Sequence, residues 1–289
     1  MPRTAHVLAL AAALCSAGAT ILIRQGLRGS GPYAGFWINL VVGTVGLWAA
    51  VPLAGGFGPP SAAGVAFFAL AGLIGTAGGR FLRFVSIEQV GASIAAALIN
   101  LPPLVASGLA ILLLGERVTA PILGGTMVIV LGTGLLSAGG RRLGFRPGQL
   151  ALPILAAACF GSVAILRKLG LGHTGAVAGS AINVTMALVT FSAFLVATGN
   201  RSALACRGRS LAYFVAAGLL ENAAVLMTVE ALGVGTVSVV VPLTGTAPIF
   251  VLSLSFFFLR GVETLSGRVV LGTLLIVLGV VLVTALPGR

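Results

Sequence analysis

Negative charge is almost absent from this sequence: there is no aspartate, and only five glutamates occur in 289 residues. The basic residues are arginines apart from a single lysine, Lys168. Charged residues make up 8% of the chain, whereas they make up about 25% of an ordinary soluble domain. Hydrophobic residues make up 58%. A chain with so few charges cannot form the surface of a soluble globule, so the sequence predicts a protein that crosses a membrane several times.

The sequence also lacks the patterns that mark catalytic and metal sites. Its three cysteines, Cys15, Cys159 and Cys206, are odd in number and far apart, so neither a disulfide framework nor a metal site is indicated. There is no H-E-x-x-H, no G-x-S-x-G, no pair of aspartates and no phosphate-binding loop. We therefore expect no enzyme activity, no cofactor, no metal and no self-contained ATP-driven transport.

Positive charge is present in excess, with a net charge of +12. The arginines stand in short turns between apolar runs and form no stripe with interleaved aromatic residues, so nucleic-acid binding is not expected. They are better explained as determinants of membrane topology and as contacts for anionic lipid. Counted over the short loops, they favour both termini outside the cell.

The stretch from Val90 to Ala138 contains two uncharged runs joined by the charged turn Gly115–Arg117. Each run is long enough to cross a bilayer, because about 20 helical residues span the hydrocarbon core. Part of this stretch recurs without a gap near the C-terminus, where Glu263 matches Glu116. Further matches extend the overlay toward the N-terminus: Phe68 with Phe214, Asn39 with Asn183, and Arg24 with Arg167. The chain therefore contains two copies of one unit, predicted at 1–140 and 147–289.

Each copy contains five apolar runs that are bounded by arginine, glycine or proline. An odd number of spans forces the second copy to enter the membrane from the opposite side. The sequence thus predicts an all-α membrane protein with ten transmembrane helices arranged as two inverted five-helix repeats, an arrangement typical of secondary transporters. The predicted spans are 5–23, 32–53, 61–80, 91–114, 119–139, 148–166, 176–197, 210–231, 235–259 and 267–286.

Three stretches resemble a known family: L-L-L-G-E-R-V-T at Leu112–Thr119, the glycine-bearing span at Gly125–Gly132, and F-G-S-V-A-I-L-R-K at Phe160–Lys168. They look like the EamA-like family of the drug/metabolite transporter superfamily, with two family units in tandem. This resemblance implies a multi-pass transporter of the cell (inner) membrane that moves a small organic metabolite, with both termini inside; metabolite export is one such activity. Asn39 and Asn183 stand where the family often has an arginine.

Prolines interrupt corresponding spans of the two copies. Pro102 and Pro103 fall at the centre of the fourth span, and Pro242 and Pro248 fall in the ninth. Proline leaves a backbone carbonyl unpaired, which is costly at membrane depth unless a cavity or partner accommodates it. The prolines therefore predict a polar midplane pocket, and a pair of packing kinks is the alternative. We expect its walls to include Asn100, Pro103, Thr244, Thr246 and Pro248.

Glu221 is the acid that falls well inside a predicted span, where a charge faces a cavity or a partner or is protonated. We expect Glu221 and its neighbour Asn222 to join the substrate site, with Glu221 as the candidate proton carrier; an internal salt bridge to Arg80 or Arg83 is the alternative. Asn39 and Asn183 could line the same cavity or form interhelical hydrogen bonds.

The expected function is secondary transport of a small organic metabolite or drug-like compound by alternating access. The expected partners are the small-molecule substrate, membrane lipid and, if transport is coupled, protons. A lipid-handling or assembly membrane protein without an aqueous substrate pathway is the alternative. Substrate identity, direction of transport and oligomeric state do not follow from the sequence.

Overall fold

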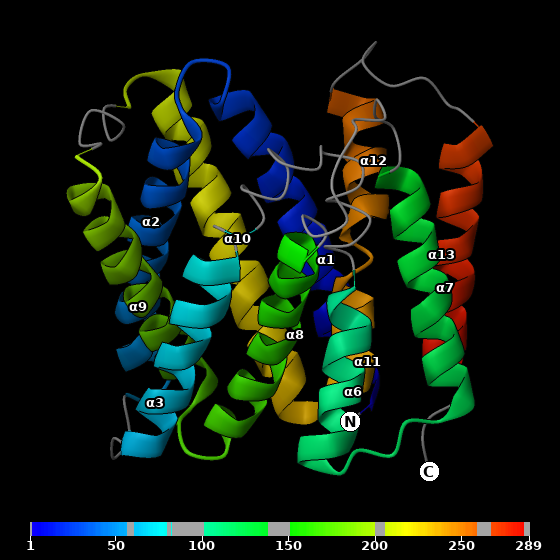
Figure 1. Cartoon of the computed structure of the whole chain (residues 1–289). Coiled ribbons are helices and arrows are strands. Elements are labelled where there is room, and N and C mark those ends of the chain that lie inside the picture. The colour runs from blue at the N-terminus through cyan, green and yellow to red at the C-terminus, as the bar shows by residue number, and fades with distance from the viewer. Residues whose placement is uncertain are drawn as a thin grey trace.

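The computed structural model describes residues 2–56, 61–79, 82, 101–137, 151–199, 206–258 and 267–285. All regular structure in these ranges is helical (Figure 1). The elements are α1 (Pro2–Gly26), α2 (Pro32–Leu53), α3 (Ala62–Ala71) with its π-helical continuation η1 (Gly72–Gly79), α6 (Pro102–Leu114), α7 (Ala120–Ser137), α8 (Ala151–Leu171), α9 (Ala176–Ala197), α10 (Arg209–Val234), α11 (Val237–Thr244), α12 (Ala247–Phe258) and α13 (Gly267–Ala285).

Six of these helical segments are long and apolar enough to cross a membrane, and four shorter apolar helices accompany them. Their outward faces carry large apolar side chains: Leu53 is 89% exposed and Leu112 is 79% exposed. Such surfaces are stable in contact with lipid tails and not in contact with water. The chain is therefore a multi-pass membrane protein. The six segments are Arg3–Gly26, Pro32–Leu53, Ala62–Gly79, Ala151–Leu171, Ala176–Ala197 and Arg209–Val234.

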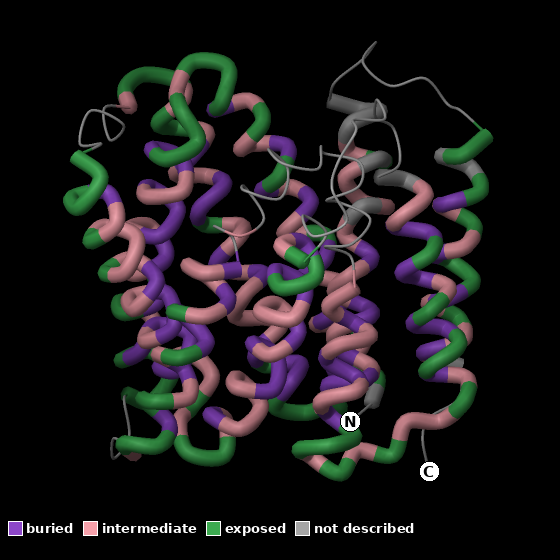
Figure 2. Tube along the Cα trace, viewed as in Figure 1, coloured by how far each residue is buried: buried purple, intermediate pink, exposed green. Residues whose placement is uncertain are grey.

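Helices of the two halves run in opposite directions. Figure 1 shows both termini at the lower edge, with α1 rising from that edge and its repeat partner α8 descending toward it. The contacts between helices follow the same symmetry: α2 packs on α9, α6 on α11 and α7 on α13, while α1 packs on α10 and α3 packs on α8. The fold thus consists of two inverted repeats, as the sequence predicted. Figure 2 shows buried residues where these helices face one another and exposed residues in the turns.

Two phenylalanines repeat one packing arrangement in both halves. Phe68 and Phe214, which the sequence overlay matched, are both fully buried. Each ring lies on two glycines of the other half, and a Cβ atom at any of these glycines would clash with it. Glycine is required here because the ring and the neighbouring backbones approach so closely. The glycines are Gly26 and Gly35 at Phe214, and Gly170 and Gly179 at Phe68.

The last helices of the two repeats, α7 and α13, also meet at glycines. A Cβ atom at Gly125 would lie 2.8 Å from the carbonyl oxygen of Gly279, and one at Gly132 would lie 2.7 Å from that of Gly272. Small residues let helix backbones approach closely in membrane proteins, and these two glycines do so here. Two further glycines of α7, Gly124 and Gly134, have nothing within 4 Å of a Cβ atom.

The predicted break in the ninth span is confirmed. Helix α11 contains Pro242 and ends at Thr244, and α12 begins at Ala247 after the link Gly245–Thr246. In the first repeat, α6 begins at Pro102. Proline is favourable at this position, because the first N–H groups of a helix have no acceptor within it and proline has no N–H to leave unpaired. The preceding part of that predicted span, including Asn100, lies outside the described residues.

Helix α8 corrects one predicted boundary. The predicted span ended at residue 166, with Arg167 and Lys168 in the loop after it. The helix continues to Leu171. Both cations are only partly exposed, and both donate hydrogen bonds to groups inside the protein. Internal acceptors allow charged residues to lie within the span.

Candidate functional site

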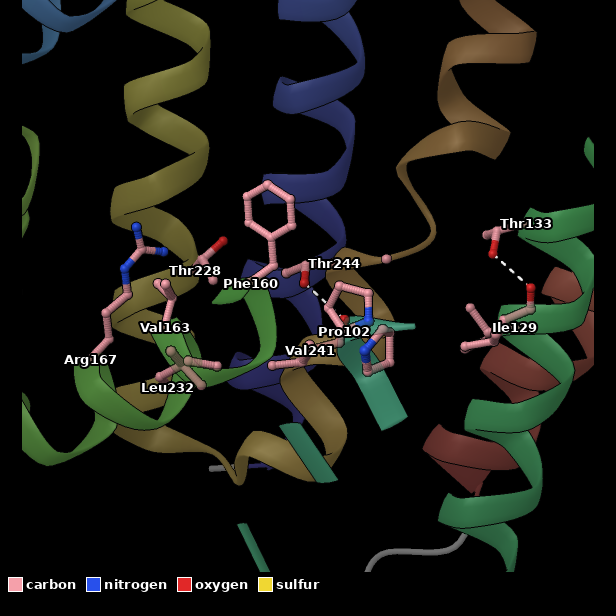
Figure 3. Close-up of a pocket in the computed structure, with 14 residues that line it drawn as sticks. Pro102, Ile129, Thr133, Phe160, Val163, Arg167, Thr228, Leu232, Val241 and Thr244 are labelled. Atoms are coloured by element: carbon pink, nitrogen blue, oxygen red, sulfur yellow. Dashed lines mark hydrogen bonds between the residues drawn. The ribbon is translucent and has the colours of Figure 1, made fainter. Parts of the chain in front are cut away.

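A cavity of about 240 Å³ lies where α6, α7, α8, α10 and α11 meet (Figure 3). Helices α6 and α7 come from the first repeat and the other three from the second, so the cavity lies between the two copies. Pro102 and Pro103 form one wall, at the start of α6, and Thr244 and Gly245 form another, at the end of α11. The ends of the two interrupted helices therefore border the cavity.

Arg167 of α8 is the charged residue among those that line this cavity in the described structure. Its Nε and Nη2 groups donate to Oδ1 of Asn183 at 3.3 and 3.2 Å, and Nδ2 of Asn183 donates to Oγ1 of Thr76 at 3.2 Å. Asn183 is only 1% exposed. This chain of bonds, which ends on the π-helical segment η1 of the first repeat, holds the guanidinium plane in one orientation.

Three threonine hydroxyls lie on the cavity wall, on α7, α10 and α11. Each donates its hydrogen to a carbonyl of its own helix: Thr133 to Val130 at 3.0 Å, Thr228 to Ala224 at 2.8 Å, and Thr244 to Val241 at 2.9 Å. A hydroxyl has one hydrogen and two lone pairs. With the hydrogen directed to the helix, the oxygen is able to serve as an acceptor toward the cavity.

Two charged side chains fasten the turn between α10 and α11 beneath this cavity. Oε1 of Glu116 accepts from the N–H of Val237 at 2.8 Å, and Oε2 accepts from the N–H and hydroxyl of Ser238 at 3.1 and 2.8 Å. Nζ of Lys168 donates to the carbonyls of Leu232 and Gly235, the latter at 2.8 Å. The carboxylate thus accepts hydrogen bonds from backbone N–H groups at the start of α11, and the ammonium donates to backbone carbonyls at the end of α10. Each charge lies at the helix end whose dipole favours it. We call this arrangement the Glu116–Lys168 clamp.

Residues 3–138 and 147–285 each match the EamA-like transporter family. The chain belongs to the EamA-like transporter family. The family is part of the drug/metabolite transporter superfamily, so this is a membrane transporter of that type, with a small-molecule substrate and a lipid environment. A protein known from a crystal structure shares the fold, with a TM-score of 0.79 at 17% identity over 96% of this chain and 95% of that one. No curated protein matches the chain.

The nine expected site residues of this EamA-like protein are distributed over several environments. Pro103 and Thr244 line the cavity, and Asn183 lies directly behind Arg167. Thr246 is 2% exposed, and its hydroxyl donates to the carbonyl of Leu243 at 2.7 Å. Asn100 and the side chain of Pro248 lie outside the described residues.

Asn39 and Asn222 lie between α2 and α10 and are not among the residues that line the cavity. Nδ2 of Asn222 donates to the carbonyl of Asn39 at 3.2 Å and to that of Gly218 at 2.7 Å. The Asn222 side chain occupies the space that a Cβ atom at Gly43 would need. Both asparagines are buried, so their visible contacts are those of helix packing.

Glu221 is partly buried on α10, two turns before Thr228. Residues seven apart share a helix face and lie about 10 Å apart along the axis. Glu221 therefore faces the same side as the cavity wall without being part of it. Its expected salt-bridge partners, Arg80 and Arg83, lie outside the described residues.

Three charged residues in or beside the cavity were not among the predicted site residues: Glu116, Arg167 and Lys168. One signal was available: Arg167 and Lys168 precede a further apolar turn, and Lys168 is the one lysine of the chain. The roles themselves could not be read from the sequence, because they depend on contacts with α9 and with the α10–α11 turn. Arg24, which the overlay matched with Arg167, is exposed at the end of α1, so the repeats differ at this position.

Proposed function

We propose that this protein is a secondary transporter that moves a small organic metabolite across the cell (inner) membrane by alternating access, with ten transmembrane spans in two halves, 1–140 and 147–289. The observation that carries the proposal is the cavity between the two repeats, bordered by the proline-containing ends of α6 and α11. Substrates of inverted-repeat transporters bind at such helix interruptions near the bilayer midplane.

The size of the cavity favours a small metabolite over a drug-sized compound. Its volume of about 240 Å³ is below the roughly 300–1,000 Å³ of typical drug-sized binding sites. Pro103 and Thr244, together with Arg167, are the residues for which we propose direct substrate contact. Asn183 supports Arg167 from behind.

Coupling to protons is proposed through Glu221. This acid shares a face of α10 with Thr228 of the cavity wall, and acidic residues within membrane spans are the usual members of proton relays in transporters. The absence of a phosphate-binding motif from the sequence directs the proposal to an ion gradient as the source of energy.

The test is flux into proteoliposomes containing the purified chain, measured for a panel of small metabolites with and without a pH gradient. Thr244→Phe fills the cavity and is expected to abolish flux, whereas Leu112→Phe, at a lipid-facing position of α6, is expected to retain it. Equal flux through both variants would contradict the proposed pathway. Movement of spin-labelled lipids without movement of metabolites would favour the lipid-handling alternative.

A further inference from the structure

We propose that three arginines at one corner of the molecule, Arg28, Arg207 and Arg209, form a docking surface for the phosphate headgroup of an anionic phospholipid. Arg28 lies in the turn between α1 and α2, and the other two lie on either side of Gly208, the residue that precedes α10. Together they are the three-arginine surface. The inference depends on the membrane environment of the chain and is independent of the proposed transport function.

The fold brings these two segments together although they belong to different repeats. A Cβ atom at Gly29 would lie 2.9 Å from Oγ of Ser210. Arg28 precedes Gly29 and Arg209 precedes Ser210, so both arginines extend from adjoining backbone segments. Figure 1 shows the α1–α2 turn beside the start of α10 at the upper edge. Basic loops that only set the membrane topology have no need to meet.

The positive charge of this surface is uncompensated within the described structure. All three arginines are exposed, and their side chains have no hydrogen bond or ion pair among the described residues. Glu221 is the described acid closest to Arg209 along the chain, and it lies about 18 Å further along α10. Like charges repel one another, and the helix dipole disfavours a cation at the start of a helix, where Arg209 lies. A bound anion would relieve both effects.

The surface lies where the apolar exterior of the protein ends. Leu27 and Leu211, which adjoin the arginine-bearing segments, are exposed, and so is Tyr33 at the start of α2. Exposed tyrosines and the ends of apolar helices mark the headgroup level of a membrane. An arginine at this level can cover apolar surface with its stem and bind two phosphate oxygens with its planar fork.

A phospholipid fits this surface better than a soluble anion does. Its phosphate meets the arginines while its acyl chains lie against the apolar helix surfaces below, so electrostatic and apolar contacts both contribute to binding. A free phosphate ion gains only the electrostatic contact, which salt screens. The occupant is therefore expected to be an anionic lipid of the surrounding membrane.

The experiment follows thermal unfolding of the full chain in mixed micelles. The probes are dioleoylphosphatidylglycerol, dioleoylphosphatidylcholine with the same acyl chains, and glycerol phosphate, which has the charge and no chains. We expect phosphatidylglycerol to raise Tm at mole fractions at which phosphatidylcholine does not, and we expect high salt to reduce this rise. Glycerol phosphate should have little effect. A micelle has no sides, so the result does not depend on the orientation of the protein.

Substitutions test the three arginines. Arg28→Gln, Arg207→Gln and Arg209→Gln should each weaken phosphatidylglycerol binding about fivefold, and the triple variant should weaken it about a hundredfold. In phosphatidylcholine the triple variant should be at least as stable as the unmodified protein, because the repulsion is removed. Replacement of all three by lysine keeps the charge and should keep most of the lipid response. Arg268→Gln, at the exposed start of α13 on the same edge, is the matched control and should bind lipid like the unmodified protein.

Each outcome supports or overturns the inference. An equal rise in Tm with phosphatidylcholine would remove the role of charge, and an equal rise with glycerol phosphate would show a site for soluble anions. Equal weakening by Arg268→Gln would show that overall charge attracts the lipid. Lower stability of the triple glutamine variant in phosphatidylcholine would show that the arginines stabilise the fold without lipid. Because no flux is measured, the transport function can fail while the lipid site stands, and the reverse also holds.

Discussion

At the scale of single residues, Lys168 shows how a cation is kept within a membrane helix. Its ammonium donates to the carbonyls of Leu232 and Gly235, at the end of α10, where the helix has acceptors without helical partners. The side chain therefore gains hydrogen bonds in place of hydration, and the carbonyls gain a donor. The same residue would be costly one turn away on the lipid-facing side.

Removing this donor should destabilise the protein. In Lys168→Met the side chain keeps its length, but two partly buried carbonyls lose a charged donor, so we expect the free energy of unfolding to fall by about 1–3 kcal/mol. Thermal unfolding in detergent measures the change. The control is Arg117→Gln, which removes an exposed cation from the α6–α7 turn and should be nearly neutral. Equal loss in both variants would argue against the Glu116–Lys168 clamp.

Glu221 carries a second prediction at this scale. Glu221→Gln keeps the shape of the side chain and removes its titration, so the protein should fold while transport loses its dependence on the pH gradient. Proteoliposome flux at matched and unmatched pH measures this. Normal pH-coupled flux would remove Glu221 from the mechanism. Collapse of expression would favour a structural ion pair.

At the scale of elements, glycines set the distance between helices. Gly35 of α2 faces the Phe214 ring, which would lie 2.6 Å from an added Cβ atom. Gly46 of the same helix has nothing within 4 Å. Gly35→Ala should therefore cost about 1–3 kcal/mol through overpacking, whereas Gly46→Ala should be neutral or stabilising through better helix propensity. Thermal unfolding of the two variants decides, and similar effects would contradict the packing account.

The α11–α12 link gives another prediction. Thr244 lines the cavity, and Thr246, two residues later, is buried. In a background without the three native cysteines, Thr244→Cys should react with a water-soluble thiol reagent and Thr246→Cys should not. Substrate should slow the reaction at residue 244. Equal reactivity at both positions would show that the link faces the cavity on both sides.

The sequence predicted elements better than it predicted the site. The overlay, together with the odd number of spans in each copy, predicted the inverted repeats, and the prolines of the ninth span predicted the broken helix, because each of these signals can be read from residue type and order along the chain. Arg167 was assigned to a loop, because a charge normally ends an apolar run. What keeps it inside is Asn183 on the next helix, and contacts between side chains of separate helices have no local signature.

At the scale of the whole molecule, charge is unequal on the two faces. Figure 1 places both termini at one edge, together with Arg3 and Arg117. More of the described arginines lie toward the other edge, after the last turn of α1 and at the starts of α10 and α13: Arg24, Arg28, Arg207, Arg209 and Arg268. Because Arg167 and Lys168 lie inside the protein, they are not included among the loop cations on the edge that has the termini. The edge without the termini is therefore the more basic, and short basic loops stay in the cytoplasm.

We accordingly expect both termini outside, against the orientation that the family resemblance implies. A fluorescent protein that matures only in the cytoplasm, fused after Arg289, should stay dark, and alkaline phosphatase at the same position should be active. Bright fluorescence without phosphatase activity would establish the opposite orientation and show that another signal outweighs the charges.

The difference between Arg24 and Arg167 follows from the joining of both repeats in one chain. If the transporter were instead a dimer of one five-helix unit inserted in both orientations, every side chain would occur in both halves. An arginine on one wall of the cavity would then face the same arginine on the opposite wall. A fused chain is free of that constraint, because a substitution in one copy is not mirrored in the other. The proposed route across the membrane is thus directional in its chemistry, since a solute that entered the cavity from one side would meet its groups in the reverse of the order met from the other.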